Sequence, residues 1–148
     1  MLPWHMDQKG LTMRKESLSF LKTLLSTPSP SGFEAPGQKV WCDYARKYAD
    51  VVKTDSYGNA VAILNPKAKF KVMLDGHADE IGLMIKHIQG NGFLSFQAIG
   101  GVDPASLRSK RVNIHTRKGV IRGVIGATAP HLTRGTGDGK APAIHDLT

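Results

Sequence analysis

The sequence predicts an α/β protein in which a portion with two helices and a mixed sheet, up to about residue 82, is followed by a β-rich, barrel-like portion. Leucines and aromatic residues recur at helical spacing within the first 50 residues. Short strand-like runs joined by turn residues follow, and they continue beyond residue 82 without a further helical pattern. We therefore expect a flexible N-terminal extension over residues 1–12, an α/β region over 13–82 and a β-rich region over 83–148.

Two amphipathic helices are predicted near the start of the chain. In Met13–Ser26 four leucines share one side, and the prolines of segment 28–30 end the helix. Ser31–Glu34 then fits a capping box, in which a serine oxygen and a glutamate carboxylate satisfy amides at a helix start. The leucines are Leu18, Leu21, Leu24 and Leu25, and the buried stripe expected in the second helix is Val40, Trp41, Tyr44, Ala45 and Tyr48. Such stripes are more often core than ligand-binding, so we assign them no function.

Strand-like runs make up the rest of the prediction. Val51–Asp55 and Ala60–Leu64 flank a turn-rich tetrapeptide and indicate a hairpin. Phe70–Leu74 is nearly continuously apolar, which favours a short strand buried on both faces of a sheet. The glycine-rich segment Thr133–Ala143 indicates a mobile loop. Two further hairpins are expected from Leu83–Ile88 with Phe93–Ile99 and from Arg111–His115 with Val120–Ile125.

Composition narrows the class of protein. The formal charge is +8, but the basic residues occur as singles and pairs without interleaved aromatic residues, which argues against nucleic-acid binding. No apolar run approaches the roughly 20 residues of a membrane-spanning helix, and the first residues do not fit a secretory signal. The single cysteine, Cys42, excludes an internal disulfide framework. We expect a cytoplasmic protein without a membrane or nucleic-acid partner.

The most suggestive chemical motif is His77-Ala78-Asp79, which follows the predicted strand Phe70–Leu74. Ligands bind open α/β sheets beyond the carboxyl ends of their strands. A neutral imidazole there can bind a metal ion, and a nearby carboxylate commonly fixes the ring through the other nitrogen. Taken alone, this spacing is weak, and a structural, hydrogen-bonded histidine is the more common interpretation.

Residues Lys71–Ile85, centred on Asp75-Gly76-His77-Ala78-Asp79-Glu80, closely resemble the first metal motif of the tetrahedral aminopeptidases. Members of this family are also called glutamyl aminopeptidases, deblocking aminopeptidases or endoglucanases. The resemblance spans about Met13 to Leu132, with Ala78 where methionine is common. Further matches follow in order at Pro30-Ser31-Gly32-Phe33-Glu34, Asp55, Gly58-Asn59, Gly92-Phe93-Leu94, Ile99-Gly100-Gly101, Asp103-Pro104, Arg111-Val112, His115-Thr116, 118–126 and Pro130-His131-Leu132.

The resemblance implies a metallopeptidase that releases residues one at a time from the amino termini of peptides, using two divalent ions, zinc or cobalt. His77 would be a metal ligand, and Asp79 would be the catalytic-site carboxylate that orients it. Residues 13–82 would be part of a mixed-sheet zinc-peptidase catalytic domain. Residues 83–148 would be the β-rich dimerisation domain through which family members assemble into dodecamers.

The resemblance also implies that this metal site is incomplete. The other family ligands are a bridging aspartate, an adjacent pair of glutamates, a further carboxylate and a last histidine, all later in the family's chain. This sequence has no Glu-Glu pair. We expect a truncated chain that is inactive alone and has an incomplete β-rich domain. The alternative is a non-catalytic homologue that serves as an assembly or interaction module.

Other motifs carry less weight. Gly135–Lys140 lacks the glycine spacing and the following Ser/Thr of a phosphate-binding loop. Ser31, which could be imagined as a nucleophile beside His77 and Asp79, already has a capping role. Cys42 has no histidine partner nearby in the sequence and is expected to be inert. The widely spaced histidines His87, His115, His131 and His145 do not follow a ligand pattern.

Overall fold

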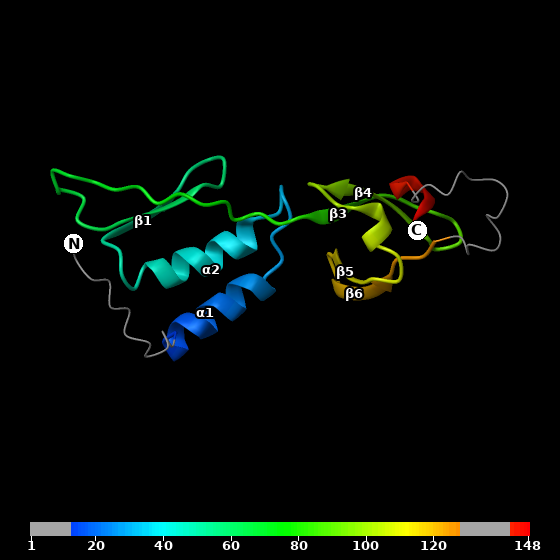
Figure 1. The fold of residues 1–148 in the computed structure, drawn as a ribbon, viewed down its shortest axis with the longest axis horizontal. Helices are drawn as coiled ribbons and strands as arrows, with labels where there is room; N and C mark the ends of the chain where they lie inside the picture. Colours follow the sequence, from blue (N-terminus) through cyan, green and yellow to red (C-terminus); the bar gives the residue numbers. More distant parts are fainter. Residues whose placement is uncertain (1–12, 128–142) are drawn as a thin grey trace, which may run out of the picture. The chain divides into compact units, whose positions relative to one another are not determined.

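The computed structural model describes residues 13–127 and 143–148 (Figure 1). The chain divides between Ala78 and Asp79 into two compact units. The first contains helices α1 (Lys15–Ser26) and α2 (Ala35–Ala45) and strands β1 (Val51–Thr54) and β2 (Ala60–Ile63). The second contains β3 (Gly82–Ile88), β4 (Leu94–Ile99), β5 (Arg111–Thr116), β6 (Gly119–Val124) and the short 3-10 helices η1 (Pro104–Ser106) and η2 (Ile144–Asp146). The predicted α/β class is confirmed.

Helices α1 and α2 lie side by side and are joined by an aromatic contact (Figure 1). The Tyr44 ring stacks on the Phe20 ring, with centroids 3.8 Å apart and planes 6° from parallel. At the edge of this contact, Lys47 Nζ lies 2.8 Å from Glu16 Oε1. Cys42, on α2, is only 3% exposed. The stripe predicted for the second helix is therefore confirmed only in part: Tyr44 packs on α1, whereas Tyr48 is 47% exposed.

The leucine stripe of α1 is covered only in part. Leu21 and Leu24 are half-buried, whereas Leu25 is 73% exposed. Met13 and Leu18 are also exposed. The helix itself was predicted correctly, but the described residues cover only one edge of its apolar side.

The start of α2 differs from the predicted capping box. The helix begins at Ala35, its cap residue is Glu34, and this cap makes no side-chain capping hydrogen bond. Instead, Gly32 N donates to Glu34 Oε1 at 2.7 Å. The reason is Pro36 in the first turn: proline lacks an amide hydrogen and is tolerated only at the first helical positions. It therefore sets the start of the helix.

Strands β1 and β2 form the predicted antiparallel hairpin, in register from Val51 opposite Ile63 to Thr54 opposite Ala60. Asp55 accepts hydrogen bonds from the amides of Tyr57 and Asn59, both at 2.9 Å, and closes the turn. Gly58 has φ 89°, a value that favours glycine.

The prediction of a strand at Phe70–Leu74 is wrong, because the structure has no strand there. Residues 71–79 have no regular secondary structure and lie between β2 and β3 (Figure 1). The segment is also not buried, since Leu74 is 94% exposed. An interior strand exists only if neighbours pair with its backbone and cover its faces. No described strand pairs with this segment.

In the second unit, the four predicted strands form as the hairpins β3–β4 and β5–β6. Each hairpin is a separate two-stranded sheet within the described ranges. Closure into a barrel needs continuous pairing around the sheet. The barrel-like arrangement and the domain boundaries at residues 12 and 82 therefore stay predictions.

The packed centre of the second unit is formed by Ile125 and Leu147, which are 3% and 2% exposed. Gly126 N donates to Thr148 O at 2.6 Å, and Leu147 bridges antiparallel to Ala127. The predicted extension 1–12 and all of the predicted loop Thr133–Ala143 except Ala143 lie outside the described residues. No helix that the structure describes has the length and apolar character needed to cross a membrane.

Candidate metal centre

His77 lies in the irregular segment that ends the first unit. Its side chain is exposed, and Gly76 before it has open space where a Cβ would stand. The division between the two units falls just after Ala78. A neutral imidazole can bind a metal ion through a ring nitrogen.

Asp79 begins the second unit and is half-buried, unlike its exposed neighbours Ala78 and Glu80. Strand β3 starts three residues later, at Gly82. His77 thus belongs to the first unit and Asp79 to the second.

The described residues do not form a complete metal site. Within residues 13–127 and 143–148, no three His, Cys, Asp or Glu side chains come together as a group that could hold a metal ion. A zinc site normally needs at least three protein ligands. The described residues do not fit a whole centre, so we derive no catalytic step through a metal ion.

The other described histidines are dispersed. His87 is opposite Ser95 in the β3–β4 hairpin, and His115 is opposite Val120 in the β5–β6 hairpin. Both are exposed. His145 Nε2 lies 3.7 Å from Asp146 Oδ1 in η2. His131 lies outside the described residues.

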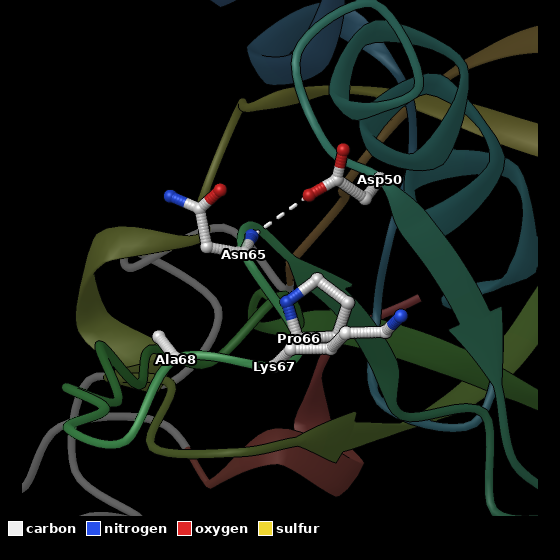
Figure 2. A pocket seen from close by; sticks show the side chains of 5 residues that line it. All are labelled: Asp50, Asn65, Pro66, Lys67 and Ala68. Carbon is white, nitrogen blue, oxygen red and sulfur yellow. Dashed lines mark hydrogen bonds between the residues drawn. The ribbon is translucent and has the colours of Figure 1, made fainter.

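An open depression of about 510 Å³ lies beside the end of β2 (Figure 2). It is lined by Asp50, Asn65, Pro66, Lys67 and Ala68. Asn65 N donates to Asp50 Oδ2 at 2.7 Å, and Asn65 has φ 53°. Because this carboxylate closes the backbone after β2, it has a structural role. The depression contains neither His77 nor Asp79.

A second, smaller depression of about 260 Å³ lies along the β1–β2 hairpin and includes Asp55. Asn59 Nδ2 donates to Asp55 Oδ2 at 2.8 Å, in addition to the two turn amides. The hydrogen bond from the Asn59 side chain is the main reason why the pKa of Asp55 lies below its ordinary value of 3.8. The carboxylate is therefore engaged in the turn.

Comparison with known families assigns the chain to a family. The profile of the M42 glutamyl aminopeptidase family matches residues 58–148, a range that contains His77 and Asp79. The chain therefore belongs to the M42 glutamyl aminopeptidase family. Membership confirms the resemblance that was inferred from residues 71–85.

Individual M42 relatives agree. The lysyl aminopeptidase of Pyrococcus furiosus is 39% identical over 115 residues, which are 77% of this chain and 33% of that protein. Among solved structures, the TET aminopeptidase from the marine sediment archaeon Thaumarchaeota archaeon SCGC AB-539-E09 is 30% identical, with a TM-score of 0.83 over 89% of this chain and 37% of that one. The TET1 peptidase of Pyrococcus horikoshii is 33% identical, with a TM-score of 0.69 over 88% of this chain and 38% of that one.

The M42 relatives are much longer than the chain, which spans about a third of their length. The sequence motif pointed to the right family. Sequence reasoning missed the exposure of Phe70–Leu74, although the lysines at 67, 69 and 71 were a signal against complete burial.

Proposed function

We propose that this chain forms the part of a metal-dependent aminopeptidase that supplies a metal ligand, His77, and the carboxylate that orients it, Asp79. The observation that carries the proposal is the family match, which includes both residues and joins the chain to relatives named as aminopeptidases. Only Ala78 separates the two residues, and peptide geometry limits their Cα atoms to about 7 Å apart. A carboxylate at that range can reach the imidazole.

The roles follow from the chemistry of the side chains. Neutral imidazole donates a ring-nitrogen lone pair to a divalent ion, and an Asp79 carboxylate that accepts the other ring N–H fixes the tautomer and strengthens the ligand. His77 would hold one such ion, and in a complete site two zinc or cobalt ions would supply the Lewis acidity that acts on the peptide carbonyl and on water. A general base is also needed, and the family's Glu-Glu pair is absent from this sequence. The substrates would be peptides with free amino termini, and the compartment the cytoplasm.

By itself, the chain is proposed to be inactive. A zinc titration of the metal-stripped chain, monitored through the NMR signals of the histidine rings, tests whether His77 is a metal ligand. We expect the His77 signals to change first, with His87 and His115 as exposed internal controls, and we expect no hydrolysis of an aminoacyl anilide. Equal changes at all three histidines would reject His77 as the ligand, and turnover that depends on His77 would reject the incomplete site.

Self-association through residues 83–148, within a barrel-like domain, is the second part of the proposal. The relative from Pyrococcus horikoshii assembles into a tetrahedron or a large octahedral shell. In this chain, β3 exposes Met84 and Ile88, and β6 exposes Ile121 and Val124. Sedimentation velocity should show a discrete oligomer, up to a dodecamer, that Ile121→Asp dissociates. A continuous size distribution would indicate non-specific edge aggregation instead.

These exposed hairpins also favour one alternative function. A non-catalytic homologue could act as an interaction module that co-assembles with a full-length aminopeptidase. Mixing the chain with a family enzyme tests this alternative. Failure of the chain to enter the enzyme's oligomer rejects the module, whereas incorporation agrees with both proposals.

A further inference from the structure

The turn between β3 and β4 contains the sequence Asn91-Gly92. Both residues are exposed, and they lie between the paired residues Ile88 and Leu94. Gly92 has φ 88°, a value that favours glycine. A Cβ added at Gly92 would meet no other described atom within 4 Å. The space beside this glycine is therefore open to a neighbouring side chain.

The Asn91 side chain is folded along the backbone that follows it. Its Oδ1 accepts a hydrogen bond from Phe93 N at 3.1 Å. An asparagine that accepts from the amide two residues later forms an Asx turn, which holds its side-chain carbonyl beside the next residue. The same hydrogen bond draws electron density from the carbonyl and makes Cγ a better electrophile. The turn thus holds an electrophilic carbon near the Gly92 nitrogen.

One contact opposes a reaction between these two atoms. Gly92 N donates to Gln89 O at 2.9 Å, and this hydrogen bond must open before the nitrogen can attack. Gln89 N also donates to Phe93 O at 2.8 Å. All of these hydrogen bonds lie within the hairpin, and loop tips open locally at a small free-energy cost. We therefore expect the folded turn to react, but more slowly than the denatured chain.

The chain has three other asparagines, and each lacks part of this arrangement: Asn59, Asn65 and Asn113. Asn65 precedes Pro66, whose nitrogen carries no hydrogen and cannot act as the nucleophile. The Asn59 side chain donates to Asp55 at 2.8 Å and is followed by an alanine. Asn113 lies inside β5 and precedes a β-branched isoleucine. The four asparagines should therefore differ in reactivity.

We propose that Asn91 is a site of spontaneous deamidation, at which the chain modifies itself with water as the only co-reactant. Gly92 N forms a bond to Asn91 Cγ, the bond from Cγ to Nδ2 breaks, and ammonia leaves with the proton of the Gly92 amide. Water then opens the cyclic imide at either carbonyl and leaves an aspartyl or an isoaspartyl residue at position 91. Nothing is oxidised or reduced, and the formal charge of +8 falls by one.

The isoaspartyl product lengthens the main chain of the turn by one methylene group. Ile88 pairs with Leu94 at this end of the hairpin, and the length of a hairpin loop sets the geometry of its turn. The modification should therefore loosen the end of the β3–β4 hairpin as the protein ages. It goes beyond the aminopeptidase role and requires neither metal binding nor assembly.

Incubation of the full chain at mildly alkaline pH, followed by proteolysis and mass spectrometry, tests the proposal. We expect conversion at Asn91 to be at least roughly tenfold faster than at Asn59 or Asn113, because only Asn91 is held beside a glycine amide. Both product isomers should be present, and an isoaspartyl carboxyl methyltransferase should methylate one of them. No conversion of Asn91 in the folded chain, or equal conversion at Asn59, overturns the proposal.

Two glycine variants sharpen the test. Gly92→Ala should slow conversion at least roughly tenfold, because a Cβ hinders approach to the amide nitrogen. Gly90→Ala is the matched control in the same turn, since a Cβ there meets no described atom within 4 Å, and it should leave the rate unchanged. Alanine at φ 88° strains the folded turn, so both variants are also compared in denaturant, where the effect of Gly92→Ala should persist. Equal rates for the two variants overturn the proposal.

Discussion

Phe20 and Tyr44 stack with ring centroids 3.8 Å apart and hold α1 against α2. Aromatic pairs of this kind contribute about 0.5–1.5 kcal/mol beyond the area that they bury. Phe20→Leu retains an apolar side chain but removes the stack. We expect the free energy of unfolding to fall by about 1 kcal/mol. Urea denaturation monitored by circular dichroism measures this change in the free energy of unfolding.

Phe70→Leu is the matched control, because Phe70 is 81% exposed and belongs to no described ring pair. We expect a change within about 0.5 kcal/mol, as for most surface substitutions. If the two variants lose equal stability, the stack does not join the helices.

Cys42 tests the packing of α2 independently. Its side chain is 3% exposed, so a thiol reagent can reach it only when the helix moves away from its neighbours. We expect alkylation of the native chain to be at least roughly 100-fold slower than in denaturant, since local opening of packed elements is rare. Labelling at the denatured rate would show that this side of α2 is open.

The β1–β2 turn should depend on pH through Asp55. Its pKa lies below 3.8, chiefly because of the Asn59 side chain. The carboxylate therefore stabilises the turn at pH values above the ordinary pKa, and this contribution is lost as the pH falls through the lowered pKa. Carboxyl NMR titration should report the lowered pKa, and Asn59→Ala should raise it toward 3.8. An unchanged Asp55 titration in that variant contradicts this cause.

Tyr48 should make the stability of the protein depend on pH in the alkaline range. Hydrogen bonding with Tyr44 is the main cause that raises the pKa of Tyr48 from 10.0 to about 12. The raised pKa means that the neutral phenol contributes stability fully below pH 10, and that this contribution is lost as the pH rises through about 12. Ultraviolet titration should show a late phenolate step that Tyr48→Phe removes. Persistence of that step would assign it to another tyrosine.

The hairpins could be predicted from sequence because their signals are local. Asp55 and Gly58 define a turn within a few residues, and the flanking runs pair with each other. Phe70–Leu74 could not be predicted in this way, because whether an apolar run becomes a buried strand depends on neighbours far away in the chain. The start of α2 was predicted wrongly because the capping motif does not take Pro36 into account, and Pro36 lies in the first turn of the helix.

The candidate site could also be predicted only in part from the sequence. Residues around His77 identified the family correctly because their order is specific. Their roles remain proposals, since a metal centre is assembled from several elements and the described residues supply no group of three ligands.

A chimaeric enzyme tests the central claim most directly. The 115 matched residues of this chain would replace the corresponding part of the Pyrococcus furiosus lysyl aminopeptidase. Hydrolysis of a lysyl anilide with zinc or cobalt would then be compared for the chimaera and its His77→Ala and His87→Ala variants. The account predicts activity that His77→Ala abolishes and His87→Ala preserves. Full activity of the His77→Ala chimaera would contradict it.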